Sequence, residues 1–224
     1  MRGHVRGIKQ DVRNANDGIS MIQTAEGGMN EVANILVRFR ELSIQAASDT
    51  IGDAERSFVN KEVQQLSQEI DRIAASTEFN GRKLLSGDGS VLEIQIGLNN
   101  NPEQDRLQFD SGRANVTTEH LGVSGLSVAT KEDAQNNLSK VDEAIKLLTE
   151  NRSELGALQN RLQSSINNMQ IYDENLTAAR SRIYDVDVAS EASELTKNNI
   201  LTSAGVAVLS QANQNNLLAL KLLG

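Results

Sequence analysis

The longest hydrophobic pattern in the chain runs from residue 138 to residue 176. Its apolar residues recur at steps of three and four, which predicts an amphipathic helix whose apolar stripe needs partner helices along most of its length. At about 1.5 Å per residue this helix would be roughly 55–60 Å long, so we expect an elongated bundle rather than a compact domain. The stripe comprises Leu138, Val141, Ile145, Leu148, Leu155, Leu158, Leu162, Ile166, Met169 and Leu176, with polar Arg152 and Asp173 at two expected stripe positions.

Two further helical patterns precede this one. The first runs from about residue 5 to residue 47, and Glu26 occupies one position where an apolar residue is expected. Asp17–Gly18 is locally a turn signal, but the periodicity passes through it without a change of phase, so we predict one continuous helix. Gly27–Gly28 marks a candidate bend. A regular four-three spacing of apolar residues predicts a second helix over residues 54–76.

A small β-hairpin is predicted over residues 91–110. Leu92, Ile94 and Ile96 alternate with polar residues, which is the period of a half-buried strand, and a second short strand follows toward the end of this segment. Such a hairpin has too little apolar surface to be stable alone, so we expect it to lie on the helices. Residues 111–130 are rich in Gly, Ser and Thr and are predicted to form a linker or loop with little core.

A third long helix is predicted over residues 131–178, capped by Thr130, and a last helix over residues 180–222. The last helix has no sequence-adjacent helix to pack on, so its apolar stripe is expected to contact another molecule, with disorder in the free subunit as the alternative. These patterns predict a mainly α fold: an elongated antiparallel bundle with a hairpin over residues 1–178, and a C-terminal helix over residues 179–224. The apolar residues of the last helix that are expected to contact another molecule are Leu195, Ile200, Leu201, Val206, Leu209, Leu217 and Leu220.

The composition supports a helical bundle and excludes several functions. Aromatic residues make up 3% of the chain, and there is no Trp and one Pro, so the core must be built from Leu, Ile, Val and Ala. The formal net charge of −8 argues against nucleic acid or an anionic membrane as a partner. The absence of Cys excludes disulfides and thiolate chemistry. No apolar run reaches the ~20 residues of a membrane span, and no signal peptide begins the sequence, so a secreted destination would require export without a cleaved leader.

The sequence offers no convincing catalytic or metal site. His4 and His120 are the only histidines, they are far apart, and neither has the spacing of a metal ligand. Glu103, Asp105 and Asp110 lie near the predicted hairpin, and we interpret them as solvated charges that discourage strand-to-strand aggregation. We therefore predict that the protein is not an enzyme and that it carries no cofactor or metal.

Two other polar signals are also best explained without chemistry. Asp185 and Asp187 are two residues apart, and on a helix their side chains would face different ways, so they are not expected to hold a metal. Asn115 begins an Asn-Val-Thr glycosylation sequon, but such triplets occur by chance in chains rich in Asn.

Several multi-residue motifs, in a constant order and covering nearly the whole chain, resemble bacterial flagellin. They include the Arg-Glu-Leu segment near residue 41 and the Asn-Gly turn before the predicted hairpin. The matching segments are residues 14–20, 23–27, 38–45, 77–85, 155–162, 175–183 and 209–214.

The resemblance implies a structural subunit that self-assembles into the flagellar filament, outside the cell, after export without a cleaved signal peptide. It implies that residues 1–178 form a rod-like inner filament domain and that residues 179–224 form a helix of the filament core. The N-terminal core helix of the family is expected to precede residue 1 and is missing from this sequence. Residues 86–130 are short where many flagellins insert large outer domains, so a minimal flagellin is expected. A non-polymerising adaptor, such as a hook–filament junction protein, is the alternative.

The resemblance also implies partners. The protein is expected to bind copies of itself, and a dedicated export chaperone is expected to hold its C-terminal segment. Arg38, Leu42, Gln45 and Glu62 match positions that contact a Toll-like receptor, and we expect a surface used first between subunits and incidentally by the receptor. From the residues alone, an ion pair between Arg38 and Glu62 on adjacent helices is the simpler interpretation. Leu66 stands where the family often has a basic residue, which is expected to alter receptor affinity.

Overall fold

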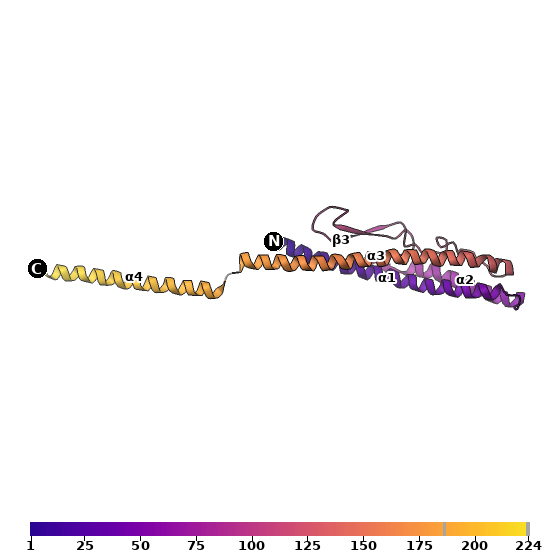
Figure 1. The fold of residues 1–224 in the computed structure, drawn as a ribbon, viewed down its shortest axis with the longest axis horizontal. Coiled ribbons are helices and arrows are strands. Elements are labelled where there is room, and N and C mark those ends of the chain that lie inside the picture. Colours follow the sequence, from indigo (N-terminus) through magenta and orange to yellow (C-terminus); the bar gives the residue numbers. More distant parts are fainter. Residues whose placement is uncertain (186, 223–224) are drawn as a thin grey trace. The chain divides into compact units, whose positions relative to one another are not determined.

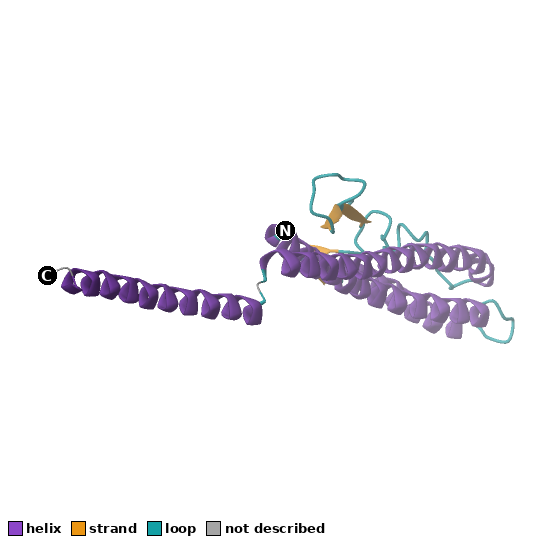
Figure 2. Cartoon of the chain, turned by 60° about the vertical axis from the view of Figure 1, so that its left-hand side comes forward, coloured by secondary structure: helices purple, strands orange, loops and turns teal. Residues whose placement is uncertain are grey.

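The computed structural model describes residues 1–185 and 187–222, without the side chains of residues 184 and 214–222. It divides into two compact units, Met1–Leu176 and Thr177–Gly224. Helices dominate both units, and in the first unit the strands and loops lie to one side of the helices (Figure 1, Figure 2). In order, the elements are α1 (Arg2–Ala46), α2 (Asp53–Ser76), β1 (Glu78–Phe79), β2 (Arg82–Lys83), β3 (Val91–Gln95), β4 (Arg106–Asp110), α3 (Lys131–Tyr184) and α4 (Val188–Leu222).

The predicted mainly α fold of antiparallel helices with a small hairpin is confirmed. α1 is continuous through Gly18 and Gly28, as the unbroken periodicity indicated. One boundary differs from the prediction, because α3 extends to Tyr184 and α4 begins only at Val188. Thr130 caps α3 as expected: its Oγ1 accepts a hydrogen bond of 3.1 Å from the backbone N–H of Asp133.

α1 and α3 run antiparallel along most of the first unit. Their buried apolar residues belong to one cluster that also includes α2, the hairpin and the segment before α3. The ion pairs between α1 and α3 follow one order: as residue numbers fall along α1, they rise along α3. The pairs are Asp49–Lys131 at 2.7 Å, Arg40–Asp142 at 2.7 Å, Glu26–Arg152 at 3.6 Å and Lys9–Asp173 at 3.9 Å, with Asp49 in the turn that follows α1.

The polar residues that interrupt the apolar stripes of α1 and α3 pair with each other. Glu26 of α1 and Arg152 of α3 each stand where an apolar residue was expected, and the carboxylate contacts the guanidinium across the two helices. Asp173, the second interruption in α3, pairs with Lys9 of α1. A shift of one helix along the other would place these charges against apolar residues, so the pairs favour a single register.

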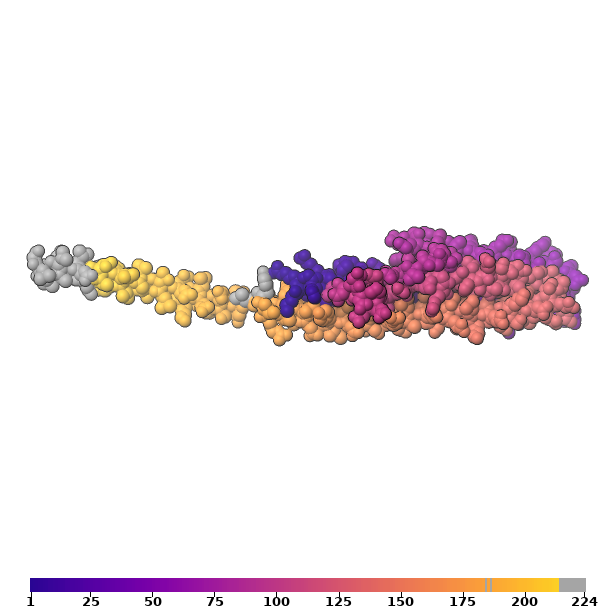
Figure 3. All heavy atoms as spheres, turned by 90° about the horizontal axis from the view of Figure 1, so that it is seen from above, coloured from indigo at the N-terminus to yellow at the C-terminus, as the bar shows by residue number. Residues whose placement is uncertain are grey.

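Glycines let the strands approach α1 closely. A side chain at Gly18 would place its Cβ 2.7 Å from Cδ1 of Ile94 in β3, and one at Gly28 would meet Leu85 at 2.7 Å and Thr77 at 2.8 Å. The β3–β4 hairpin therefore rests directly on the helix backbone. In Figure 3 the hairpin, drawn in magenta to pink, lies beside the indigo start of α1 and the orange part of α3. Gly18, interpreted from the sequence as part of a turn signal, and Gly28, interpreted as part of a candidate bend, are therefore contact points.

A second, very short hairpin was not anticipated. β1 and β2 pair antiparallel, with Phe79 opposite Arg82. The two residues between them, Asn80 (φ 51°) and Gly81 (φ 76°), both adopt the left-handed conformation. This is the backbone of a type I′ turn, which Asn-Gly favours. The turn pair was identified correctly, but strands of two residues are too short to produce a readable alternation.

Residues 111–130 form a loop without helices or strands, as predicted, but the prediction that they carry little core is wrong. The segment is pinned to α2: Asp71 accepts hydrogen bonds of 2.9 Å from both the N–H and the hydroxyl of Thr118, and Gln64 donates to the carbonyl of Leu126 at 2.8 Å. Turns at glycines with positive φ break the spacing of its apolar residues, so no regular period shows in the sequence. Its buried apolar residues are Ala114, Val116, Leu121, Val123, Leu126 and Val128.

The neighbouring glycines of α1 provide a matched test of close packing. A Cβ added at Gly27 would have no heavy atom within 4 Å, whereas Gly28 faces the fully buried Leu85 and a Thr77 whose hydroxyl donates to the carbonyl of Ile73. We predict that Gly27→Ala raises the free energy of unfolding by about 0.5–1 kcal/mol through helix propensity. Gly28→Ala should lower it by about 1–3 kcal/mol through overpacking. Urea unfolding followed by circular dichroism distinguishes these effects, and equal shifts in the two variants would contradict the packing described.

Candidate interaction surfaces

A buried arginine fixes the turn that positions α2 against α1. The guanidinium of Arg56 donates hydrogen bonds to the carbonyls of Ala46 at 2.6 Å, Ser48 at 3.1 Å and Ile51 at 3.0 Å, and the residue is 7% exposed. These carbonyls lie at the C-terminus of α1 and in the turn that follows, where a cation is electrostatically favoured. These hydrogen bonds close the turn between α1 and α2, and the two helices lie side by side.

An ion pair between Arg38 and Glu62 joins the exposed sides of α1 and α2. The Nε and Nη2 atoms of Arg38 each lie 2.9 Å from Oε1 of Glu62, and its Nη1 lies 3.1 Å from Oε2 of Glu41. The side chains of Arg38 and Glu62 are 49% and 46% exposed, so solvent weakens the pair while a partner can still reach both groups. The hydrogen bond to Glu62 is the largest of the effects that raise the pKa of the Arg38 guanidinium. The predicted pairing between helices is confirmed.

Leu42 does not belong to this surface. Its side chain is 1% exposed and lies in the core between the helices, so the expectation that it offers an apolar patch to a partner is wrong for the isolated chain. Gln45 is exposed, as expected. The large apolar residues that are exposed on α1 are Val37 and Ile44, at 49% each, and on α2 the large exposed apolar residue is Phe58, at 67%. These three fall outside the three-four spacing of the core, which is the signal in the sequence that marks them as outward-facing.

α4 exposes every one of its described side chains. Leu195 and Ile200 are each 63% exposed, Leu201 is 59%, Val206 is 64% and Leu209 is 65%. The side chains of two further expected residues, Leu217 and Leu220, lie outside the described part of the chain. An apolar surface of this extent on one helix is unusual for a protein that stays monomeric.

The apolar residues of α4 do not form the single stripe that was predicted. At about 100° per residue, Leu195, Val206 and Leu209 share one face of the helix, whereas Ile200 and Leu201 fall toward the opposite side. α4 consequently lacks the amphipathic asymmetry of α1. A helix that is apolar on all sides is typical of one surrounded by several neighbours rather than lying on a flat surface.

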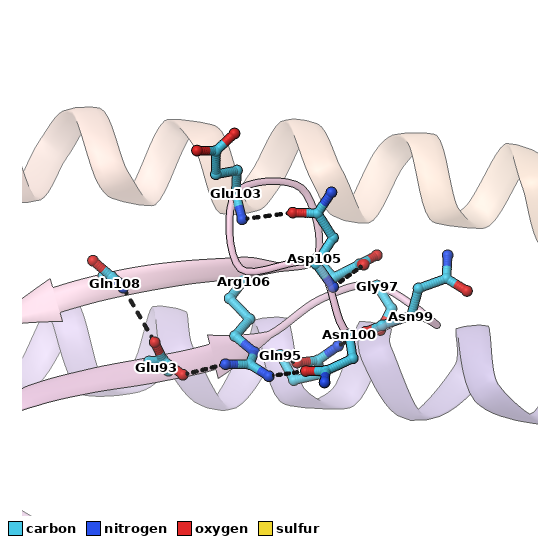
Figure 4. A network of polar contacts seen from close by, with 10 residues as sticks. Glu93, Gln95, Gly97, Asn99, Asn100, Glu103, Asp105, Arg106 and Gln108 are labelled. Carbon is cyan, nitrogen blue, oxygen red and sulfur yellow. Dashed lines mark hydrogen bonds and ion pairs between the residues drawn. The ribbon is translucent and has the colours of Figure 1, made fainter.

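Two acidic residues of the hairpin, Asp105 and Asp110, accept hydrogen bonds from backbone N–H groups in its turns. Asp105 is 8% exposed and its Oδ2 accepts a hydrogen bond of 3.0 Å from the backbone N–H of Asn101, so its interpretation as a solvated edge charge is wrong. Glu103 is exposed, and Asp110 accepts from the N–H of Gly112 at 2.8 Å. Figure 4 shows Glu103 and Asp105 within a network of amides and carboxylates that closes the end of the hairpin. No reactive pair of carboxylates results.

Asp185 and Asp187 lie between helices, so the premise that they share a helix is wrong. Asp185 accepts a hydrogen bond of 2.6 Å from the hydroxyl of Ser181. Asp187 caps α4, because its Oδ1 accepts from the N–H groups of Ala189 at 3.0 Å and Ser190 at 3.3 Å. Asp187 followed by Val-Ala-Ser-Glu, with Glu191 in the first turn, is the signal in the sequence that could have located this helix start.

The described residues contain no other arrangement that points to chemistry. Among them, no three His, Asp or Glu side chains gather closely enough to hold a metal ion. His4 and His120 are both exposed. Within the same residues, no helix has the length and apolar character that crossing a bilayer requires.

Two family models match the chain. The bacterial flagellin N-terminal helical region matches residues 1–90, and the bacterial flagellin C-terminal helical region matches residues 138–222. The chain belongs to the bacterial flagellin family. This flagellin is a minimal form, because only residues 91–137 separate its two helical regions. The predicted function is confirmed: the protein is a structural, non-enzymatic subunit of the flagellar filament, which is extracellular.

Related flagellins cover the whole chain. A flagellin of Halalkalibacterium halodurans is 41% identical over 223 residues, which are 100% of this chain and 81% of that protein. A flagellin of Bacillus subtilis is also 41% identical, covering 100% of this chain and 83% of that one. The crystal structure of Bacillus cereus flagellin has a TM-score of 0.62 and 30% identity, and the match covers 70% of this chain and 88% of that one.

The burial of Leu42 in this flagellin generates a direct test. We predict that Leu42→Ala lowers the free energy of unfolding by about 2–5 kcal/mol, because it removes a fully buried side chain from the core. Gln45→Ala, one turn further along the same helix and exposed, should change it by no more than about 0.5 kcal/mol. Urea unfolding measures both. A Leu42→Ala variant as stable as the parent chain would show that this residue is not part of the core.

Proposed function

We propose that α4 is the segment through which this flagellin is buried among copies of itself in the filament core, and that residues 1–178 form the rod-like inner domain around that core. The observation that carries the proposal is the exposure of apolar side chains on all sides of α4. One neighbouring helix covers only part of a helix surface, so full coverage needs several neighbours. A helical assembly of identical subunits supplies them.

The polar residues of α4 support the same role. Between Lys197 and Lys221 the sequence carries no charged residue, and its polar positions are filled by Asn, Gln, Ser and Thr. Neutral amides and hydroxyls can be buried at low cost when they hydrogen-bond to neighbours, whereas unpaired charges cannot. The surface of this segment is therefore compatible with burial over its whole circumference.

The same side chains would bind the export chaperone before assembly. Because chaperone and neighbouring subunits would cover the same apolar residues, the two states exclude each other. A chaperone that presents one groove covers one face of α4, so we expect it to depend most on the face that carries Leu195, Val206 and Leu209.

A receptor-binding role is proposed for the edge formed by Arg38, Gln45 and Glu62. These side chains are exposed, they come from adjacent helices, and they combine a guanidinium, an amide and a carboxylate within one surface. Arginine in such a setting is a frequent hot spot of binding. The apolar contribution to this surface would come from Phe58 rather than from Leu42, which is buried.

Single aspartates on α4 test the filament-core proposal in the complete gene product. We predict that Leu209→Asp and Ile200→Asp, on opposite faces of α4, each abolish long filaments, because each would bury an unpaired charge. Leu209→Met keeps an apolar side chain of nearly the same volume at the same position and should leave assembly nearly unchanged. Electron microscopy of purified filaments and sedimentation of the subunits measure the outcome.

Two results would contradict this account. Long filaments from the Ile200→Asp variant would show that α4 is covered on one face only. Short caps instead of long filaments from the unmodified protein would favour the non-polymerising junction role over the filament role.

The receptor proposal has a matched control on the same helix. Arg38→Ala should weaken binding to the flagellin-sensing Toll-like receptor on the order of tenfold or more, because it removes the guanidinium from the exposed edge. Arg40→Ala removes an equally exposed arginine that pairs with Asp142 of α3 at 2.7 Å, and it should leave receptor binding nearly unchanged. Surface plasmon resonance with the receptor ectodomain compares the two. Equal losses would show that net charge, rather than this edge, governs binding.

A further inference from the structure

The turn between β1 and β2 holds the only Asn-Gly pair in the sequence, and its reactive groups are free. Asn80 and Gly81 are both exposed and form the type I′ turn described above, with φ of 51° and 76°. Asn80 also lines an open groove beside α1 and β3, so water reaches its side chain. Within the described part of the chain, neither the side-chain amide of Asn80 nor the N–H of Gly81 makes a hydrogen bond.

This turn can bring the backbone nitrogen of Gly81 onto the side chain of Asn80 while the strands stay paired. The first central residue has ψ of about +30° in a type I′ turn and about −120° in a type II′ turn, with φ of roughly +60° in both. The two turns differ by a rotation of the central peptide, and both connect paired strands. In the second turn the nitrogen of Gly81 lies close to Cγ of Asn80. Gly81 accepts both turns because φ changes sign at its position, which a residue with a Cβ resists.

We propose that Asn80 is a site of spontaneous deamidation. The nitrogen of Gly81 loses its proton to hydroxide and attacks Cγ of Asn80. A C–N bond forms, the Cγ–Nδ2 bond breaks, and Nδ2 takes a proton from water and leaves as ammonia. Water then opens the five-membered imide at either of its carbonyls, which gives aspartate or isoaspartate. The net reaction consumes one water and releases one ammonia.

The first of two Asp-Gly pairs, which form the same ring by loss of water, is blocked by helix α1. Asp17 and Gly18 lie inside α1, so the N–H of Gly18 belongs to the hydrogen-bond ladder of the helix. Helical ψ also holds this nitrogen away from the carboxyl carbon of Asp17.

The second Asp-Gly pair is blocked by hydrogen bonds to its carboxylate. Gly89 has a positive φ of 72°, like Gly81, but Oδ1 of Asp88 accepts from the hydroxyls of Ser111 at 2.7 Å and Ser90 at 3.0 Å. These hydrogen bonds, that of Ser111 first, lower the pKa of the Asp88 carboxyl. Ring closure from aspartate requires the protonated acid, so it is disfavoured here.

Asn115 is an internal control, because its corresponding groups are both engaged. Its Oδ1 accepts hydrogen bonds of 2.9 Å from the N–H and the hydroxyl of Thr117. The N–H of Val116, which would have to attack, donates to the carbonyl of Leu85 at 3.1 Å. Val116 also carries a branched Cβ next to that nitrogen, which hinders its approach.

Isoaspartate would change the packing around the turn as well as its charge. It adds one carbon atom to the backbone between β1 and β2, where Phe79 stands opposite Arg82. Immediately after β2, the N–H of the fully buried Leu84 donates to the carbonyl of Thr77 at 3.1 Å. A longer turn displaces these partners, so the isoaspartyl form should hold Leu84 less firmly.

Peptide mapping of the full chain by mass spectrometry tests the proposal. In mildly alkaline buffer, Asn80 should be converted at least about tenfold faster than Asn115, which corresponds to about 1.4 kcal/mol in activation free energy. The rate should rise in proportion to hydroxide, because the attacking nitrogen must lose its proton. Comparable rates at the two asparagines, or a product at Asn80 that contains aspartate but no isoaspartate, would overturn the proposal.

A pair of glycine variants separates this turn from a general effect of flexibility. Gly81→Ala places a Cβ beside the attacking nitrogen and should slow deamidation of Asn80 by about tenfold or more. Gly89→Ala alters another exposed glycine of positive φ, where a Cβ meets no atom within 4 Å, and should leave the rate at Asn80 unchanged. Circular dichroism checks that both variants fold, and a parent-like rate in Gly81→Ala would contradict attack by this nitrogen.

Hydrogen exchange measures the structural consequence. In the isoaspartyl form, separated by ion-exchange chromatography, the amide of Leu84 should lose protection. Asn80→Asp adds the charge without the extra backbone atom and should retain it. Equal protection in the isoaspartyl form and the parent chain would show that the turn absorbs the longer backbone.

Discussion

The first unit depends on one helix meeting three different kinds of neighbour at once. α1 packs on α3 through large apolar side chains, on α2 through a shorter apolar edge, and on the hairpins through Gly7, Gly18 and Gly28. These demands are compatible only because each face carries side chains of a different size. Large residues fill the space between helices about 8–10 Å apart, whereas glycine lets a strand approach the helix backbone. The glycines lower the helix propensity of α1, and the contacts that they permit offset that loss.

The helices could be read from the sequence because their apolar residues keep one period over many turns. The same reasoning failed wherever the chain turns every few residues. Residues 111–130 bury six apolar side chains, yet their spacing follows turns and hydrogen bonds to α2 rather than any period. The break before the last helix was predicted at residue 179 rather than before Val188 for a related reason, since apolar residues on both sides of Asp187 continue a helical spacing. A capping aspartate is a local signal, and in this chain it outweighed the periodic one.

The candidate interaction residues also divide into those whose position the sequence predicted correctly and those whose position it did not. The partnership of Arg38 with Glu62 follows from two helices in contact, and the sequence sufficed to predict it. Leu42 keeps the three-four spacing of Leu36 and Phe39, so the apolar pattern of α1 indicated its burial, and only the resemblance to receptor-contacting positions suggested that it faces a partner. The two faces of α4 show a further limit, because a list of apolar residues does not state their angles around the helix. Exposure in the folded chain distinguishes apolar residues that hold the subunit together from those available to other molecules, and hydrophobicity in the sequence alone does not.

The pairing of Glu26 with Arg152 and of Lys9 with Asp173 bears on how a polymer of this protein responds to force. Helices joined only by aliphatic contacts can slide past one another by small steps at little cost. Here sliding would also separate opposite charges, so the pairs oppose a change of register between α1 and α3 within the first unit. An axial load on the first unit is therefore shared by α1 and α3 rather than carried by either helix alone.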